Sequence, residues 1–198
     1  TGVPAWLTFN AATGTFSGTP PQDFNGSVNV TVTATDPGGL TASDTFTLTV
    51  TPVNDAPVVA NALADQAVNE DTAVSFTVPA NAFSDVDSAS LTYSATQTGG
   101  APLPAWLAFD AVTRTFSGTP PLNFNGVLNL TVTASDGTLT ASDNFTLTIN
   151  PVNDAPVLAV ALADQTVAED TALSFTVPAS AFTDVDNATL TYSATLAG

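Results

Sequence analysis

The sequence contains no cysteine, no histidine and no lysine, and Arg114 is its single basic residue. Without cysteine, no disulfide can stabilise the fold. Histidine, cysteine and lysine are also the side chains that most often act as general bases and nucleophiles in enzymes. All three are missing, so we expect that the chain is not an enzyme.

Positive charge is almost absent, whereas Asp and Glu together number 18, which gives a net charge of −17. Binding to nucleic acid or to an anionic membrane requires clustered Lys and Arg. The sequence also lacks an apolar run of about 18 residues, the length that a membrane-spanning helix needs. We therefore expect no nucleic-acid partner and no membrane insertion. This many uncompensated carboxylates instead favour the binding of cations.

Methionine is absent as well, so Thr1 is not a translation start, and we expect the chain to be a piece of a longer protein. Its 198 residues are enough for one or two domains. Apolar residues make up 44% of the sequence, which predicts a folded hydrophobic core rather than a disordered chain.

The sequence repeats with a period of about one hundred residues. Pro4–Phe9 recurs as Pro104–Phe109, and Thr15–Pro21 recurs as Thr115–Pro121. After a one-residue deletion in the Asp136-Gly137 turn the offset becomes 99, so that Val53–Val58 matches Val152–Val157. A repeat of roughly 20–50 residues would indicate a solenoid. A repeat of this greater length indicates a string of independent sandwich domains, which are about 100 residues each.

Each repeat shows the alternation that is typical of half-buried β-strands. Val28, Val30 and Val32 alternate with polar residues, and Val74, Phe76 and Val78 do the same. Turn dipeptides such as Asn-Gly and Asp-Gly separate these runs, and no segment has a sustained helical period. The pattern predicts an all-β protein built from tandem antiparallel β-sandwiches.

Two Asn-Asp-Ala-Pro segments follow a predicted strand and precede the next one, and their proline stops strand pairing. We place linkers there. The predicted organisation is the C-terminal half of a domain at 1–53, a linker at 54–57, a complete domain at 58–152, a linker at 153–156 and the N-terminal half of a domain at 157–198.

Each half-domain would expose unpaired strand edges and half of a core, which is unstable in isolation. The two halves are complementary, but joining them within one chain would require folding back past the complete domain. We therefore hypothesise that neighbouring copies pair head to tail, which would propagate into a filament. The alternative is that the chain is a window on a continuous array of repeats.

Three motifs together resemble a known family: Trp6–Pro20 with its Gly-Thr-Phe-Ser-Gly-Thr-Pro segment, Ala34–Leu40, and Val53–Pro57. The chain resembles the cadherin-like and dystroglycan-type cadherin-like repeats, also described as Ig-type domains, of large bacterial surface proteins. The resemblance covers essentially the whole chain. It implies an extracellular, cell-surface location, a role as a spacer or adhesive stalk, and Ca²⁺ ions at the linkers between domains.

Calcium binds six to eight hard oxygen ligands from carboxylates, Asn side chains and backbone carbonyls. The Asp85-Val86-Asp87 segment offers two carboxylates about thirty residues after the first linker. In cadherin-like domains this loop returns to the linker, so the resemblance implies two sets of ligands. The set at the first linker is Asn54, Asp55, Asp85, Asp87, Asp136 and Asp23. The set at the second linker is Asn153, Asp154, Asp184, Asp186, and Glu70 or the adjacent Asp71.

The sequence also departs from the family pattern. Pro52 and Pro151 stand where the linker usually has another Asp, and the acidic motif in mid-domain is reduced to Gln22-Asp23-Phe24 and Leu122-Asn123-Phe124. We therefore expect one or two ions per linker rather than a cluster of three. The alternative is that these Asp and Asn residues only cap turns.

A second class of function is a domain that binds a surface glycan or a protein receptor. Trp6 and Trp106 are the side chains that could stack on a sugar. Their Pro-Ala-Trp-Leu-x-Phe context instead favours a strand that packs its aromatic residue into the sandwich. A structural spacer is therefore our first hypothesis for the function, and a ligand-binding domain is the second.

Overall fold

The computed structural model describes residues 3–196, and every regular element in that range is a β-strand. No helix in the described residues is long and apolar enough to cross a membrane. The chain divides into two compact units, which are described separately. Unit 1 comprises Thr1–Ala60, Phe83–Thr92 and Ala134–Ala141, and unit 2 comprises Asn61–Ala82, Tyr93–Thr133 and Ser142–Gly198.

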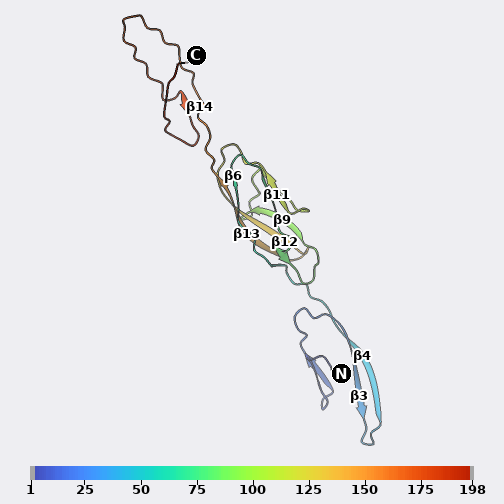
Figure 1. The fold of residues 1–198 in the computed structure, drawn as a ribbon. Coiled ribbons are helices and arrows are strands. Elements are labelled where there is room, and N and C mark those ends of the chain that lie inside the picture. Colours follow the sequence, from blue (N-terminus) through green and yellow to red (C-terminus); the bar gives the residue numbers. More distant parts are fainter. Residues whose placement is uncertain (1–2, 197–198) are drawn as a thin grey trace. The chain divides into compact units, whose positions relative to one another are not determined.

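Unit 1 is built from strand pairs. Strand β1 (Leu7–Asn10) pairs antiparallel with β2 (Thr15–Gly18), with Leu7 opposite Gly18. Strands β3 (Gly26–Thr35) and β4 (Thr41–Val50) form the long hairpin in Figure 1, with Gly26 opposite Val50. Short strands β5 (Val58–Val59) and β8 (Phe83–Ser84) form a third antiparallel pair, and β5 directly follows the first linker in the chain.

Unit 2 contains most of two larger sheets. One has the order β10 (Leu107–Asp110), β11 (Thr115–Gly118), β7 (Val74–Thr77). The other has the order β6 (Gln66–Asn69), β13 (Thr140–Asn150), β12 (Gly126–Ser135), β9 (Thr92–Gln97). The edge strand β6 runs parallel to β13, unlike the antiparallel pairs that the sequence predicted.

Three phenylalanines join the two sheets into a β-sandwich. Phe116 of β11 stacks on Phe76 of β7 with ring centroids 4.7 Å apart. Phe145 of β13, in the other sheet, meets these two rings edge-on at 5.7 and 5.3 Å. Leu130, Leu147 and the other inward residues of β12 and β13 are buried at every second position. The predicted all-β sandwich with period-two strands is therefore confirmed.

The stretch from 157 to 196 contains less regular structure than its counterpart one repeat earlier. Strand β14 (Val157–Leu158) pairs antiparallel with β15 (Phe182–Thr183). Within the described residues, the counterparts of β6, β7 and β9 in this stretch are not strands. The two linkers lie between β4 and β5 and between β13 and β14. The division into one complete domain and two halves stays a prediction.

The two Trp residues occupy equivalent places beside a glycine. Trp6 and Trp106 are half-buried and contact Phe24 and Phe124, with ring centroids 5.5 and 5.8 Å apart. A Cβ at Gly18 would lie 1.9 Å from the Trp6 carbonyl oxygen, and Gly118 has the same relation to Trp106. The hairpins thus need glycine where the backbone passes the Trp.

Candidate metal centres at the two linkers

The six residues predicted at the first linker lie within unit 1 and come from all three of its segments. We call them the first linker cluster: Asp23, Asn54, Asp55, Asp85, Asp87 and Asp136. Asp85 follows β8 directly, and its Oδ1 accepts hydrogen bonds from the backbone N–H groups of Asp87 (2.8 Å) and Ser88 (2.7 Å). Its other oxygen, Oδ2, is buried and has no hydrogen-bond partner.

Asp87 connects this loop to the linker. The backbone N–H of Asp55 donates a hydrogen bond of 2.7 Å to Asp87 Oδ2. Because Asp85 shapes the turn that presents Asp87, the Asp-x-Asp spacing places one carboxylate against the linker backbone and keeps the other beside it. These contacts bring the loop to the first linker, as the family resemblance implied.

Asp136 approaches the same linker from the turn between β12 and β13. Its Oδ1 accepts hydrogen bonds from the backbone N–H groups of Leu139 (2.7 Å) and Thr138 (2.6 Å), and its Oδ2 accepts one from Asn54 Nδ2 at 2.8 Å. The hydrogen bonds from Leu139, Asn54 and Thr138, in that order of size, hold the pKa of Asp136 well below its usual value. Asp136 is therefore ionised and tied to Asn54.

Asp55 is in the opposite electrostatic situation. Its partial burial raises its pKa, and Asp23 raises the pKa further through a side-chain hydrogen bond and through its charge. The charges of Asp87 and Asp85 act in the same direction. Asp23 thus reaches the linker, and three carboxylates, those of Asp23, Asp85 and Asp87, act on Asp55 with no cationic group among the causes of its shift.

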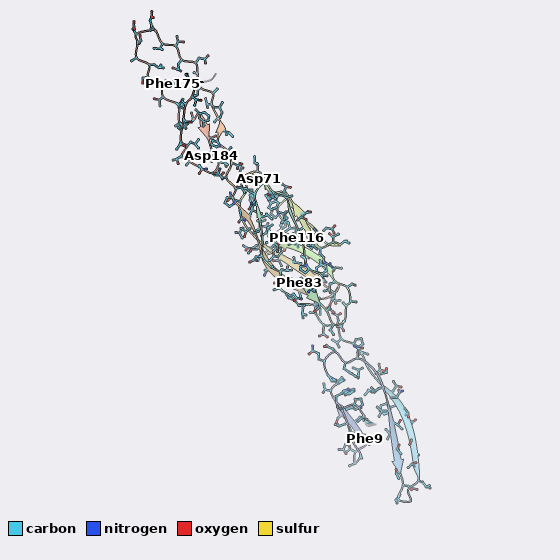
Figure 2. The ribbon with its side chains drawn as sticks, viewed as in Figure 1. Phe9, Asp71, Phe83, Phe116, Phe175 and Asp184 are labelled. Atoms are coloured by element: carbon cyan, nitrogen blue, oxygen red, sulfur yellow. The ribbon has the colours of Figure 1, made fainter. Side chains whose placement is uncertain are left out.

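The second linker repeats this arrangement within unit 2. We call the second linker cluster the set Glu70, Asp71, Asn153, Asp154, Asp184 and Asp186. Asp184 Oδ1 accepts hydrogen bonds from the N–H groups of Asp186 (2.9 Å) and Asn187 (2.7 Å). The N–H of Asp154 donates to Asp186 Oδ2 at 2.6 Å, as the N–H of Asp55 does to Asp87. Figure 2 labels Asp71 and Asp184 in this cluster.

Asp154 is the carboxylate of the second cluster with a buried, unpartnered oxygen and a raised pKa. Its Oδ2 is buried without a hydrogen-bond partner. Burial raises its pKa first, followed by the charges of Asp186, Asp71, Glu70 and Asp184. The second cluster therefore gathers four carboxylates around Asp154, which is the counterpart of Asp55.

Glu70 is the only charged residue with a fully buried side chain in the described part of the chain, at 2% exposure. Its Oε1 accepts a 2.6 Å hydrogen bond from the N–H of Val152, and its Oε2 lies 3.4 Å from Asn125 Nδ2. The neighbouring Asp71 accepts a 3.4 Å hydrogen bond from the N–H of Asn123. Glu70 thus fixes the start of the second linker to the body of the sandwich.

Sequence reasoning missed Asn187 as a member of the second cluster. Its Nδ2 donates to Asn153 Oδ1 at 3.0 Å and lies 3.2 Å from Asp184 Oδ1. The available signal was its position three residues after Asp184, where a side chain shares the turn that the carboxylate caps. Its counterpart at the first linker is Ser88.

Most carboxylates of the clusters accept hydrogen bonds, but one buried oxygen on Asp85 and one on Asp154 have no partner. Asp85, Asp136 and Asp184 do cap turns, as the alternative interpretation holds. Among residues 3–196, no three acidic side chains are arranged tightly enough to form a ready metal-binding group. However, capping uses only Oδ1 of Asp85, and a buried Oδ2 without a partner is the kind of hard oxygen that Ca²⁺ takes as a ligand. The donor chemistry of both clusters therefore fits calcium.

Comparison with known families agrees with this architecture. The family described as "putative Ig domain" matches residues 1–51 and 56–150. The chain belongs to this family. No curated protein matches the sequence.

Solved structures extend the comparison to the fold. Extracellular cadherin domains 1–5 of protocadherin gamma B2 match with a TM-score of 0.54 at 18% identity, over 84% of this chain and 34% of that one. The endo-fucoidan hydrolase MfFcnA4 of glycoside hydrolase family 107 is 26% identical, with a TM-score of 0.39, over 76% of this chain and 23% of its own. Titin domain M7 is 20% identical, with a TM-score of 0.35, over 50% of this chain and 99% of its own. The first similarity shows a cadherin-like, Ig-like fold, and the other two TM-scores are too low to support an argument.

Proposed function

We propose that this chain is an extracellular structural or adhesion module, a spacer within a tandem array of Ig-like domains whose linkers bind Ca²⁺. The observation that carries the calcium proposal is the buried, unpartnered carboxylate oxygen at each linker, on Asp85 and on Asp154. Each belongs to a group of carboxylates that repel one another in a chain with a single basic residue. A divalent cation bound at each linker would neutralise this repulsion.

At the first linker, Asp55, Asp85 and Asp87 would hold the ion, with Asn54, Asp136 and Asp23 completing the set. At the second, the ion would be held by Asp154, Asp184 and Asp186, with Asn153, Glu70 and Asp71. Calcium would supply positive charge and oxygen coordination there. The chain itself would have a mechanical role. Carboxylates from the linker and from the Asp-x-Asp loop lie close together, and without an ion their mutual repulsion would favour movement of the linker. One or two ions per linker suit this reduced set.

The proposed role is non-catalytic, and its partners are neighbouring copies of the same repeat, joined head to tail, together with the calcium ions. Binding of a surface glycan or protein receptor ranks lower. A sugar platform needs exposed aromatic faces, whereas Trp6 and Trp106 are half-buried against Phe24 and Phe124.

Thermal unfolding in calcium and in chelator tests the proposal. At calcium concentrations about 100 times Kd, each site should stabilise the fold by about 2.7 kcal/mol, which raises Tm. Small-angle scattering should show an extended particle in calcium and a bent one in chelator. If calcium shifts neither Tm nor the scattering profile, the ion has no place in the function.

A variant with Asp85→Asn and Asp184→Asn should lose the calcium-dependent rise in Tm. Asparagine keeps the Oδ1 acceptor that caps the turn and removes the charge. Asp110→Asn is the matched control, because Asp110 Oδ1 caps a turn in the same way through Val112 (2.8 Å) and Thr113 (3.1 Å) and lies outside both clusters. Equal loss of the calcium response in both variants would mean that the clusters are not the site.

A further inference from the structure

The middle repeat has an open groove between the edge strands of its two sheets. Strand β10 is the outermost strand of one sheet and β9 is the outermost strand of the other, so within residues 3–196 no further strand pairs with their outer edges. The groove between them has a volume of about 640 Å³. Its residues all belong to unit 2 and to the middle repeat, far from both ends of the sequence. We call it the β9–β10 groove.

The β9–β10 groove is largely apolar. Tyr93 and Ala95 line it from β9, Leu107 and Phe109 from β10, and Leu103 from the loop between the two strands. None of the described residues that line it is acidic or basic. The chain as a whole has a net charge of −17, so this is a surface whose own side chains do not repel an acidic ligand.

The loop that forms one wall of the groove is held in place by its own hydrogen bonds. Gly99 and Gly100 have φ angles of 95° and 88°, which glycine adopts freely and which let the chain turn back after β9. The backbone N–H of Gln97 donates to the Ala101 carbonyl at 2.8 Å, and Gln97 Nε2 donates to the Pro102 carbonyl at 2.7 Å. This wall is pre-formed, so binding requires little further ordering of the loop.

The single basic residue of the chain lies beside the groove. Arg114 Cζ is 5.6 Å from the centre of the ring of Tyr93, which lines the groove. Arg114 is half-buried, and its Nε is buried without a hydrogen-bond partner. A guanidinium that stacks on an aromatic ring still presents its N–H groups as a planar fork, which matches the geometry of a carboxylate. The side chain is therefore placed to bind an anionic group at the groove.

The backbone at Arg114 suits glycine better than arginine. Its φ is 57°, and Gly14, at the equivalent turn of the preceding repeat, has a φ of 66°. Residues other than glycine rarely adopt this conformation. The Arg114 carbonyl accepts a hydrogen bond from the N–H of Val78 at 2.9 Å, which a glycine could accept equally well. The side chain, rather than the turn, therefore accounts for arginine at this position.

We propose that the β9–β10 groove binds an extended peptide segment of a partner protein as an added strand, and that Arg114 binds one carboxylate of this peptide. Backbone pairing with an exposed sheet edge supplies affinity, and the apolar groove takes alternate side chains of the peptide. The segment carries one acidic group and is otherwise uncharged, because a chain with a net charge of −17 repels a polyanion. The same repulsion disfavours an acidic polysaccharide. The inference goes beyond the spacer role and does not require calcium.

Fluorescence anisotropy with the full chain tests the proposal. The probe is a labelled, end-blocked peptide of about seven residues, a typical strand length, in which valine alternates with threonine. It carries one glutamate, at either the first or the last residue, so that both directions of pairing are covered. We expect the chain to bind one of these two peptides and to bind its glutamine counterpart about tenfold more weakly. Binding of neither glutamate peptide would overturn the inference.

Arg114→Gly removes the guanidinium and introduces the residue that the preceding repeat has at this turn, so the backbone is not strained. It should weaken binding of the glutamate peptide about tenfold and leave binding of the glutamine peptide unchanged. Arg114→Lys keeps the charge without the planar fork and should recover only part of the affinity. Val112→Ala is the matched control in the same turn, because Val112 is 91% exposed and its counterpart is Ala12. Circular dichroism reports whether each variant is folded.

The strand-like mode of binding has its own measurement. Chemical-shift changes in the ¹⁵N-labelled chain should concentrate in β9 and β10 rather than in β6 and β7, which are the opposite edges of the two sheets. N-methylation of alternate peptide bonds removes N–H donors from one edge of the probe, and one of the two methylated patterns should abolish binding. Changes at β6 and β7, or binding that neither methylated pattern affects, would contradict an added strand in this groove.

A short galacturonate oligomer is the probe for the alternative ligand. If it binds in an Arg114-dependent way and the glutamate peptides do not, the groove is a site for acidic sugars and the peptide proposal is wrong. All titrations are made in calcium and in chelator. Equal peptide binding in both buffers would leave the groove proposal standing even if calcium changes neither Tm nor the scattering profile. A calcium-dependent Tm without peptide binding would remove the groove proposal alone.

Discussion

The middle repeat and the stretches on either side of it have nearly the same sequence but different degrees of burial. Phe116 in β11 has no exposed surface, whereas Phe16 in β2 is half-buried, although both lie in the segment Thr-Phe-Ser-Gly. Val78 is 1% exposed, and its counterpart Val177 is half-buried. The local sequence is shared, so the difference comes from the partner strands. In the middle repeat, β7 and β13 place Phe76 and Phe145 against Phe116 and bury it.

The largest effect that would test this comparison is the loss of one core ring in each setting. Phe116→Ala should destabilise the middle sandwich by about 3–5 kcal/mol, because it leaves a cavity next to Phe76 and Phe145. Phe16→Ala, at a ring that is only half-buried, should cost about 1 kcal/mol or less. Urea unfolding of the two variants measures both values. Equal losses would mean that the outer stretch already has a complete core.

The same contrast explains how much of the fold could be predicted from sequence. Alternation at Val28–Val32 and at Val74–Val78 predicted strands, and both form as β3 and β7. The equal alternation at 173–177 does not give a strand in the described chain. Period-two patterning reports which face of a segment is apolar, but it does not report whether a partner strand is present. The parallel edge strand β6 was missed for the same reason, since direction of pairing is a tertiary property.

The candidate sites show a similar limit. The Asp-x-Asp spacing is visible in the sequence, but the contact between Asp55 and Asp87 joins residues 32 positions apart. Only the family resemblance brought these two together in the prediction. Asn187 was missed because its partner Asn153 lies 34 positions away and the first linker has Ser88 at the equivalent place. A pattern that differs between repeats offers no repeat-based signal.

A smaller effect should separate the two acidic residues that open equivalent loops. Glu70→Ala should cost about 1–3 kcal/mol, because the N–H of Val152 loses its acceptor and Asn125 loses a contact of its side chain. Glu169→Ala, at the exposed counterpart, should change stability by no more than about 0.5 kcal/mol. Glu70→Gln keeps an oxygen acceptor and should recover most of the loss. Thermal unfolding measures all three. A cost for Glu169→Ala that matched that of Glu70→Ala would show that the outer loop is already packed like the middle one.

The smallest effect concerns acid, and it should distinguish Asp154 at the second linker from Asp136 at the first. The pKa of Asp154 is raised by burial first and by Asp186, Asp71, Glu70 and Asp184 next. A group whose pKa is higher in the folded state binds its proton more tightly there, so folding gains stability as the pH falls from neutral through the raised pKa towards the unfolded value of about 3.9. Asp136 has the opposite sign. Its lowered pKa contributes stability above about 3.9 and loses it as the pH falls further.

In chelator, mild acidification should therefore raise Tm slightly, and Asp154→Asn should reduce this rise because the neutral amide has no proton to gain. In calcium the sign should reverse, because protons compete with the ion for the same carboxylate oxygens. Tm measured against pH in both buffers, for the unmodified chain and for Asp154→Asn, gives four curves. If the chelator and calcium curves of the unmodified chain fall together on acidification, the carboxylates at the linkers are not held in mutual repulsion.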